Sequence, residues 1–314
     1  MRVFLTGGTG LVGSLLVKKL CERGDSVVML SRRPEVAKQQ FGAAVTVVAG
    51  DPVQAGPWMD AVADCDAVVH LAGEGIFNRR WSQEFKDLIY SSRIQSTNNV
   101  VAAFGKSSPL PAAGEGPGVR GRVLVSGSAI GFYGPHGDEE LTENSLAGND
   151  YFAKLCTDWE NAAQAASKQG VRVVLLRTGV VFDKHGGALT KMLPPFKMGV
   201  GGPIAGGRQY MSWIHNEDLC GVILYALDHA DLVGPLNATA PKPVTNKEFS
   251  TVLGKVLGRP SFLPTPGFAL RIMLGEVSQV ITQGQRVLPR KALAAGYPFK
   301  FTDVEAALRD LLAK

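Results

Sequence analysis

The sequence has few cysteines, and their spacing suggests neither a disulfide framework nor a metal site. The four cysteines, Cys21, Cys65, Cys156 and Cys220, are dispersed and form no C-x-x-C pair. We therefore expect reduced thiols in a cytosol-like compartment and predict no metal site. The chain also lacks an apolar run that approaches the length of a membrane span, so we expect a soluble protein.

We also expect no cleavable signal peptide, because the first predicted strand begins at residue 2. We expect a cytoplasmic protein, or one of the plastid stroma if an organelle-targeting segment has been removed. Long runs of one charge are absent too: Lys and Arg outnumber Asp and Glu by 33 to 28, a formal net charge of +5. This mild excess suits an anionic small ligand, whereas no basic run is long enough to indicate nucleic-acid binding.

The chain does contain a glycine-rich turn between an apolar run at residues 3–5 and a helical pattern at 15–20. The turn supplies the candidate cofactor residues Gly7, Thr9, Gly10, Leu11, Val12 and Gly13. A strand, a glycine turn and a helix together present backbone N–H groups and a helix N-terminus to a pyrophosphate. Gly7 would permit the tight turn, Gly10 the approach of the phosphates, and Gly13 close packing of the helix. An ordinary glycine-rich turn is the alternative interpretation.

The residues after the second predicted strand, 26–30, decide between the two nicotinamide dinucleotides. An NAD site usually has Asp or Glu there to bind the ribose 2′-hydroxyl, but this chain has Ser31, Arg32 and Arg33. Arg can form a forked contact with a 2′-phosphate and Ser can donate to it, whereas a carboxylate would repel it. We therefore predict NADP(H) as the cofactor. A solvated basic loop is the alternative, and it would still leave no acid for NAD.

Further apolar runs at residues 45–50, 67–72, 122–126 and 171–177 read as strands, with helical patterns at about 82–106 and 150–168. This alternation predicts an α/β fold of the Rossmann type, a doubly wound parallel sheet covered on both faces. Asp51 would accept a hydrogen bond from the adenine amino group or simply form a turn before Pro52. Arg93, in the long helix, is a candidate contact for a cofactor phosphate or the substrate, and a solvated arginine is the alternative.

The pattern changes at about residue 186. The glycines at 199, 201, 202, 206 and 207 fall in a loop that would close over a substrate or simply connect two elements. A strand at 211–215, a helix capped by Asn216, a short strand at 237–239 and helices near 246–257, 265–275 and 303–313 follow. We divide the chain into a Rossmann domain, 1–185 rejoined by about 208–240, and a smaller, mostly helical C-terminal lobe, 186–207 and 241–314. Residues 107–121 read as a surface loop without chemistry.

These motifs, from residue 1 to about 220, resemble in order those of the extended short-chain dehydrogenase/reductases, which include sugar-nucleotide epimerases and dehydratases. The matching features are the glycine turn, Asp51, residues 70–73, residues 126–128, Tyr133 with Gly134, Arg177, and residues 213–218. The resemblance implies a cofactor site that also includes Leu71, Ala72, Gly73, Glu74, Arg93, Arg177, Thr178 and Gly179.

A closer resemblance, over nearly the whole chain, is to an atypical subgroup usually called epimerase-family or cell-division-inhibitor-like proteins. The marks of this subgroup are residues 71–74, 91–93, 156–160, 175–181, 191–196, 201–204 and 288–290. The subgroup includes bacterial proteins of unsettled activity and plastid proteins linked to chloroplast division.

The catalytic motif of the larger family is missing from this chain. Active members use Tyr-x-x-x-Lys, in which Tyr transfers a proton while Lys lowers its pKa and holds the nicotinamide ribose. Counting back from Glu160 puts Phe152 in the Tyr position and Cys156 in the Lys position. Phe carries no proton and Cys no fixed positive charge.

Three residues remain as candidates for chemistry. Ser128 stands in the family's Ser position, where it would orient the substrate oxygen. Tyr133 would replace the proton donor, or it is a packed aromatic at the end of a strand. Cys156 would be a nucleophile, or it is a small buried helix residue.

Two functions follow as hypotheses. The first is an NADP(H)-dependent oxidoreductase or sugar-nucleotide epimerase-like enzyme with a rearranged catalytic set, acting on a nucleotide sugar or a carbonyl compound. The second is a catalytically silent regulator or scaffold that senses NADP(H) and acts through a protein partner, in cell or plastid division.

Overall fold

A computed structural model describes residues 1–106 and 121–313 of the chain. The surface loop predicted over 107–121 therefore lies almost wholly outside the described residues. The described part is built on a parallel sheet of seven strands, each paired in parallel with its neighbours. In spatial order they are β3 (Val45–Ala49), β2 (Ser26–Ser31), β1 (Arg2–Thr6), β4 (Ala67–His70), β5 (Val123–Ala129), β7 (Arg172–Thr178) and β11 (Gly234–Ala238).

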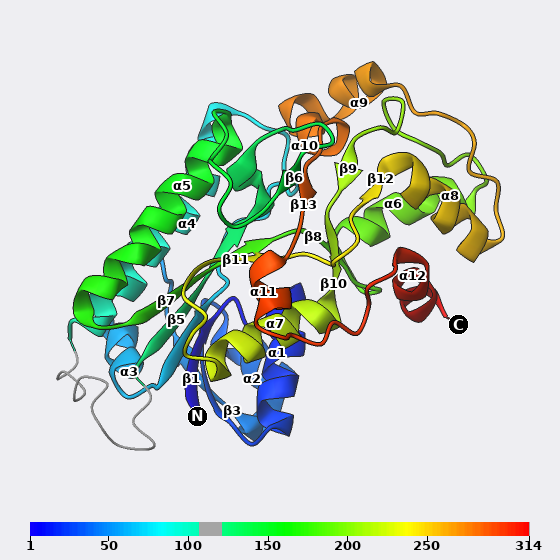
Figure 1. Cartoon of the computed structure of the whole chain (residues 1–314). Helices are drawn as coiled ribbons and strands as arrows, with labels where there is room; N and C mark the ends of the chain where they lie inside the picture. The colour runs from blue at the N-terminus through cyan, green and yellow to red at the C-terminus, as the bar shows by residue number, and fades with distance from the viewer. Residues whose placement is uncertain (107–120, 314) are drawn as a thin grey trace.

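Helices cover both faces of this sheet (Figure 1). One face carries α1 (Leu11–Glu22), α2 (Pro34–Phe41), α7 (Asn216–Asp228) and α11 (Arg290–Ala294). The other carries α3 (Asp60–Ala63), α4 (Gln83–Phe104) and α5 (Tyr151–Gln164). Because both faces are covered, the central strands are near-continuous apolar runs. The predicted Rossmann-type α/β fold is confirmed.

Short 3₁₀ helices join several of these elements. They are η1 (Gly42–Ala44), η2 (Pro57–Met59), η3 (Ile130–Tyr133), η4 (Ala165–Gln169) and η5 (Gly275–Ser278).

The remaining elements form a mostly helical part at the carboxyl edge of the sheet, drawn from yellow to red in Figure 1 together with α6. Its helices are α6 (Gly187–Lys197), α8 (Asn246–Leu257), α9 (Gly267–Leu274), α10 (Gln279–Thr282) and α12 (Val304–Leu312). Short strand pairs join it to the rest: β8 (Val180–Phe182) with β10 (Trp213–His215), β9 (Tyr210–Met211) with β12 (Val244–Thr245), and β6 (Glu140–Leu141) with β13 (Arg286–Val287).

This part has its own apolar core. Phe182 and Trp213 stack with ring centroids 5.6 Å apart, and Phe249 of α8 lies 5.4 Å from Phe182. Leu189 and Leu193 of α6 and the buried side of α12 close the cluster. Large aromatic side chains bury much apolar area each, so this cluster holds the helices against β8 and β10.

The described helices begin largely where side-chain caps occur. Ser82 accepts a hydrogen bond from the backbone N–H of Phe85 and caps α4, and Asp150 accepts from Ala153 and caps α5. Both predicted starts are confirmed. The predicted cap at Asn216 is wrong by one residue: His215 is the N-cap of α7, and its Nδ1 accepts from the N–H of Glu217 at 3.0 Å.

Two further details differ from the sequence analysis. Helix α6 lies before the predicted glycine loop and was not predicted, although Leu189, Leu193 and Phe196 recur at helical spacing and bury one face. The strand predicted over 211–215 is split at Ser212, whose hydroxyl donates to the carbonyl of Gln285 and accepts from the N–H of Val287. Its two halves, β9 and β10, therefore pair with different partners.

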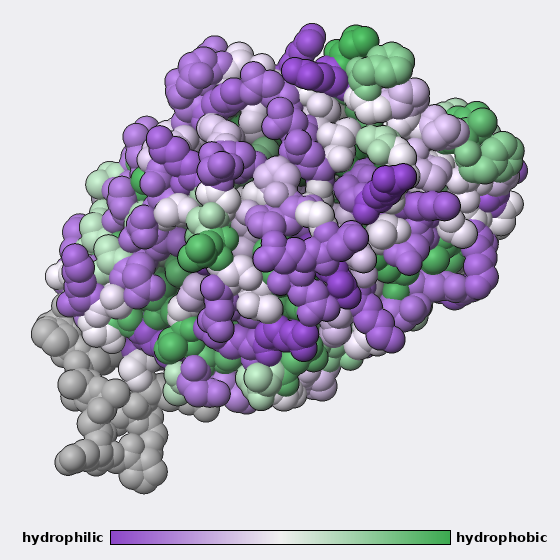
Figure 2. All heavy atoms as spheres, turned by 45° about the horizontal axis from the view of Figure 1, so that its top comes forward, coloured by the Kyte–Doolittle hydropathy of each residue, from purple (hydrophilic) through white to green (hydrophobic). Residues whose placement is uncertain are grey.

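The surface carries no extended apolar sheet or groove on the face seen in Figure 2, which is mostly hydrophilic with hydrophobic side chains in separate patches at its edges. Among the helices of residues 1–106 and 121–313, none combines the length and apolar character that crossing a membrane requires.

Candidate cofactor and substrate site

The glycine turn joins β1 to α1 and has no room for side chains. Gly7 has a φ of 74°, and a Cβ added there would lie 2.8 Å from the carbonyl carbon of Leu71. A Cβ on Gly13 would lie 2.2 Å from the carbonyl oxygen of Gly7. Gly10 is the N-cap residue of α1 and has no side chain to satisfy the first N–H groups of the helix, those of Leu11 and Val12 among them. The turn therefore fits an anionic phosphate at the helix N-terminus, and Thr9 is exposed beside it.

Two exposed cations lie next to this turn. Thr6 of β1 pairs with Leu30 of β2, so the residues after β2 emerge beside the residues after β1. Ser31 is buried and its hydroxyl accepts from the backbone N–H of Arg33 at 3.1 Å. Arg32 and Arg33 are exposed, and neither forms an ion pair within the described residues. Unpaired guanidinium groups at this edge suit a 2′-phosphate.

The end of β4 closes the same edge. The backbone N–H of Ala72 donates to the hydroxyl of Thr6, and that of Glu74 donates to the hydroxyl of Ser92 on α4. These contacts bring the predicted residues Leu71, Ala72, Gly73 and Glu74 together with the glycine turn. Asp51, after β3, accepts a hydrogen bond from the N–H of Val53 at 3.0 Å, which is the turn geometry foreseen as its alternative role.

Arg93 is not a solvated helix residue. Its guanidinium packs over the ring of Trp159 at 5.1 Å, and a Cβ added to Gly73 would lie 3.4 Å from its Cζ. It donates to the carbonyl of Ile89, and no carboxylate forms an ion pair with it within the described residues. Burial lowers the pKa of Arg93, and its charge acts on Cys156 across the interface between α4 and α5. A half-buried, unpaired cation therefore lies at the end of β4.

A cavity of about 300 Å³ lies at the carboxyl ends of β5 and β7, and we call it the strand-end cavity. Strand ends, the loop before α4, α5 and the C-terminal part all contribute to it. The lining includes Ile76, Phe77, Ala129, Ile130, Gly131, Asp150, Phe152, Thr178, Gly179, Val180, Val181, Gly187, Ala188, Gln279, Val280, Gln283 and Gln285. Two predicted cofactor residues, Thr178 and Gly179, therefore face the same space as the family's Tyr position.

Leu11 connects the glycine turn to this cavity. Its side chain is the nearest group to both Gly186 and Gly187, with a distance of 3.0 Å from a Cβ added at either glycine. Gly187 itself lines the strand-end cavity. A dinucleotide whose phosphates lie on the turn would therefore have this cavity within reach of its other end.

The two positions of the missing motif lie on the side of α5 that faces the sheet. Phe152 lines the cavity, and a Cβ on Gly131 would lie 3.2 Å from the Cβ of Phe152. Cys156 lies one turn further on and is only 3% exposed. Burial, with a smaller contribution from Glu160, raises the pKa of the Cys156 thiol to about 12. A protonated buried thiol matches the structural interpretation of Cys156 rather than the nucleophilic one.

Ser128, Tyr133 and Arg177 are not among the residues that line the cavity, and their roles in catalysis and cofactor binding stay predictions. The carboxylate of Glu160 accepts from the Ser128 hydroxyl at 2.7 Å and from Nε and Nη2 of Arg177 at 2.8 Å each. Arg177 also donates to the Tyr133 hydroxyl, which donates to Asn237. All are buried, and burial raises the pKa of Tyr133. A buried arginine needs such partners, so these residues form a structural network.

His70 is a packed strand residue. It is fully buried, its Nδ1 lies 2.7 Å from the hydroxyl of Thr6, and its Nε2 lies 3.1 Å from the hydroxyls of both Ser96 and Thr97. Burial lowers the pKa of His70 to about 4, so the ring is neutral at pH 7.

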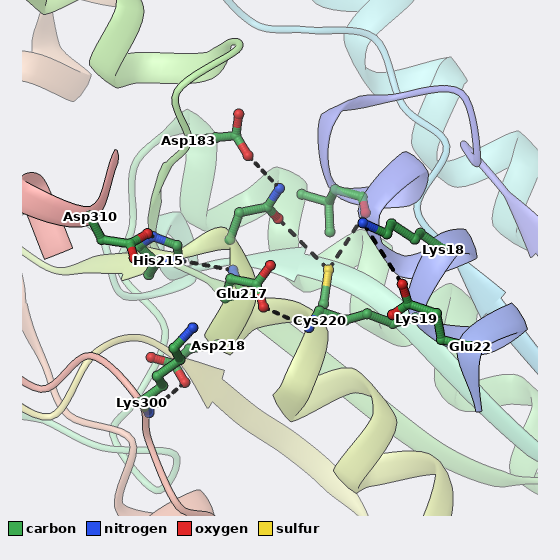
Figure 3. Close-up of polar contacts among 12 residues, drawn as sticks. Lys18, Lys19, Glu22, Asp183, His215, Glu217, Asp218, Cys220, Lys300 and Asp310 are labelled. Atoms are coloured by element: carbon green, nitrogen blue, oxygen red, sulfur yellow. Dashed lines mark hydrogen bonds and ion pairs between the residues drawn. The ribbon is translucent and has the colours of Figure 1, made fainter. Parts of the chain in front are cut away.

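A larger cavity, of about 780 Å³, lies on the outer side of α1, between that helix, residues 183–185 and α12. Polar residues that line it are engaged: Glu217 pairs with the neighbouring Lys19 at 2.6 Å (Figure 3), and Asp183 accepts from Asn216 at 2.8 Å. It shares no lining residue with the strand-end cavity. Volume alone does not mark a site, so we assign the candidate site to the strand-end cavity. No cluster of three or more side chains suited to a metal ion occurs in the described ranges.

Comparison with known proteins identifies the family. Residues 3–238, which contain all of the seven-stranded sheet except its first residue, match the NAD dependent epimerase/dehydratase family. The chain belongs to this family. In this chain the glycine turn lies at the amino end of the region that matches the NAD dependent epimerase/dehydratase family. Residues 265–311 match a further domain of unknown function, DUF1731.

Plant and mammalian relatives of the chain carry the name SDR39U1. The chain is 42% identical to the chloroplastic SDR39U1 homolog of Arabidopsis thaliana, over 99% of this chain and 87% of that protein. It is 37% identical to human SDR39U1 over the full length of both. A crystal structure of human SDR39U1 (isoform 2) with NADPH superimposes with a TM-score of 0.85 and 35% identity, covering 99% of each chain. The predicted resemblance to the epimerase-family proteins is confirmed.

A more distant member shares the fold alone. UDP-glucuronic acid 4-epimerase from Bacillus cereus, in complex with UDP-glucuronic acid and NAD, superimposes with a TM-score of 0.77 at 14% identity, over 99% of this chain and 98% of that one.

Sequence reasoning missed the residues that the C-terminal part contributes to the cavity, Gln279, Gln283 and Gln285, because no local pattern marks them. It also missed the partnership of Glu160 with Arg177. An arginine at the end of a buried strand requires a carboxylate, and that requirement was a usable signal.

Proposed function

We propose that the chain binds NADP(H) and acts as an oxidoreductase of the short-chain dehydrogenase/reductase type without a Tyr–Lys pair. The observation that carries the proposal is the continuity of the site through Leu11, from a glycine turn flanked by unpaired arginines to the strand-end cavity. The NADPH in the human SDR39U1 crystal structure supports the choice of cofactor.

The glycine turn and the first N–H groups of α1 would hold the pyrophosphate, and Ser31, Arg32 and Arg33 the 2′-phosphate. NADP(H) supplies a hydride acceptor or donor. Arg93 takes over part of the role of the missing Lys, because its unpaired charge lies beside the Gly73 backbone and acts on Cys156, which occupies the Lys position. Phe152 offers no proton, so water supplies the proton in this proposal.

Equilibrium titration of the full chain with NADPH, NADH and both oxidised forms tests the cofactor. We expect NADPH to bind at least about tenfold tighter than NADH, because only NADPH offers a phosphate to Arg32 and Arg33. Turnover is then measured as NADPH oxidation against a broad panel of aldehydes, ketones and nucleotide sugars. Tight NADPH binding without any turnover would remove the enzymatic part of the proposal and leave the cofactor part standing.

One observation favours a second candidate, an NADP(H)-sensing regulator that acts through a protein partner in cell or plastid division. The C-terminal part exposes large apolar side chains, with Phe262 74%, Phe268 71% and Ile272 71% exposed. Hydrogen exchange of residues 260–285 with and without NADPH tests this candidate. Unchanged exchange would argue against it, since the two states must differ for a partner to sense the cofactor.

We also propose where in the cell the protein acts. We place the protein in the cytoplasm, or in the plastid stroma as the name of the chloroplastic Arabidopsis homolog suggests for that protein.

A further inference from the structure

The strand-end cavity is small and mostly apolar. Its volume of about 300 Å³ lies at the lower end of the range for ligand sites, and NADP(H) would take part of it. Ile76, Phe77, Ile130, Phe152 and Val280 supply much of its wall. Nucleoside diphosphate ligands are larger than the space that remains.

The charges around the cavity are arranged against an anion. Of its lining residues in the described part of the chain, Asp150 alone carries a charge at pH 7. The nearby cations are not among its lining residues: Arg32 and Arg33 lie at the end of β2, and Arg93 lies beside Gly73 against Trp159. Lys191 is not a lining residue either, although its Nζ is 5.3 Å from the ring centroid of Phe77, which lines the cavity. Although the whole chain has a net charge of +5, no positively charged side chain lines this cavity in the described part of the chain.

Side-chain amides and the Thr178 hydroxyl, which donates to the carbonyl of Leu176, supply the remaining side-chain polarity. Gln279 and Gln283, on α10 and just after it, are exposed at the rim, and no side-chain hydrogen bond of either is found within the described residues. Gln285 donates to the carbonyl of Ile130 at 3.3 Å. An amide both donates and accepts, so it suits a carbonyl oxygen or a hydroxyl without requiring charge.

We propose that the substrate is an uncharged, mainly apolar carbonyl compound of about one ring, or the corresponding alcohol, and not a nucleotide sugar or a carboxylate. This inference rests on the proposed oxidoreductase function. The carbonyl carbon accepts a hydride from NADPH, the C=O π pair moves to the oxygen, and a proton from water completes the alcohol as NADPH becomes NADP⁺. Asp150 excludes anions by repulsion across a poorly hydrated space.

Binding of two matched alcohols to the NADPH-loaded full chain tests recognition apart from turnover. Benzyl alcohol is neutral, 4-(hydroxymethyl)benzoate carries a carboxylate, and neither reacts because alcohol and cofactor are both reduced. We expect benzyl alcohol to bind about tenfold tighter or more, by calorimetry or ligand-observed NMR. UDP-glucose should not compete with it.

The variant Asp150→Asn should reduce the ratio of the affinities for benzyl alcohol and 4-(hydroxymethyl)benzoate, because it removes the charge while Asn still caps α5. The control Asp231→Asn removes the same charge from an exposed loop before β11. This loop lies at the amino ends of the strands, whereas the cavity lies at their carboxyl ends, so the affinity ratio should stay unchanged.

Equal or tighter binding of the carboxylate, competition by UDP-glucose, or no binding of either alcohol would overturn the substrate class. Failure of the oxidoreductase proposal looks different: NADPH does not bind, or no compound of the panel is turned over, whatever the ratio of the two alcohols.

Discussion

The two ends of the candidate site are held by different kinds of structure. At the glycine turn, the backbone leaves no space for a Cβ at Gly7 or Gly13. At α5, by contrast, Phe152 and Cys156 are packed side chains at the positions that the sequence analysis predicts for the Tyr and Lys of the motif. Cofactor binding therefore depends on main-chain geometry, whereas proton chemistry depends on two replaceable side chains. The same fold can keep the first while it loses the second.

Breaking the buried ion pair behind α5 should have the largest effect. Arg177→Met leaves the Glu160 carboxylate buried with only the Ser128 hydroxyl, at a cost of about 3–5 kcal/mol in the free energy of unfolding. Denaturant unfolding measures it, with Arg309→Met as the control, because its pair with the exposed Glu305 should contribute little to stability. If Arg177→Met unfolds like the parent but no longer binds NADPH, Arg177 acts in cofactor binding rather than in stability.

Gly13→Ala should come next, because the added Cβ meets the Gly7 carbonyl oxygen at 2.2 Å and backbone atoms cannot move aside. We expect a destabilisation near the upper end of about 1–3 kcal/mol together with loss of NADPH binding. Thermal unfolding and titration measure the two effects. Gly137→Ala is the control, since nothing lies within 4 Å of its added Cβ and its φ is not positive. A Gly13→Ala variant with parental affinity would show that the turn does not hold the pyrophosphate.

Arg32→Asp tests the predicted contact with the 2′-phosphate and changes only an exposed side chain. Loss of a charge-assisted contact with the 2′-phosphate should weaken NADPH binding by about 1.5–3 kcal/mol, and the preference over NADH should shrink or reverse. Competitive titration with both cofactors measures this. Arg259→Asp, an exposed position after α8, makes the same change of charge and should leave the preference intact. An unaltered preference in Arg32→Asp would mean that Arg33 or another group reads the phosphate.

The smallest effect is expected from alkylation of the cysteines, because Cys156 should not be modified in the folded chain. With a pKa of about 12, only about one Cys156 thiol in ten thousand is ionised at pH 8, and the side chain is buried. Iodoacetamide should therefore modify the half-exposed Cys21 first, as peptide mass mapping can show. The reaction at Cys156 should rise only as pH approaches 12 or as the chain unfolds. Rapid modification of Cys156 at pH 8 would instead support a nucleophilic role.

Much of the fold was predictable because its signals are local. Apolar runs alternate with helical patterns, and Ser82 and Asp150 mark the starts of α4 and α5 with their own side chains. Helix α6 escaped prediction because its stability comes from burial of Leu189 and Leu193 against the C-terminal core rather than from residues near it in the chain.

The candidate site was predictable only where its residues belong to a local sequence motif. The glycine turn is a local motif, and its residues lie together in the structure. Arg177 was assigned to the cofactor because its partner, Glu160, lies on another element, and only the fold shows the pair. The glutamines of the cavity come from a segment about a hundred residues beyond β7, and no short-range pattern connects them with it.

The network around Glu160 also bears on how this protein can change over time. Glu160 ties α5 to β5 through Ser128 and to β7 through Arg177, one turn beyond Cys156. Neither Phe152 nor Cys156 takes part in these bonds, so an exchange of either side chain leaves both anchors of the helix in place. The scaffold can therefore vary at the positions predicted for proton chemistry while it keeps the ties between α5 and the sheet.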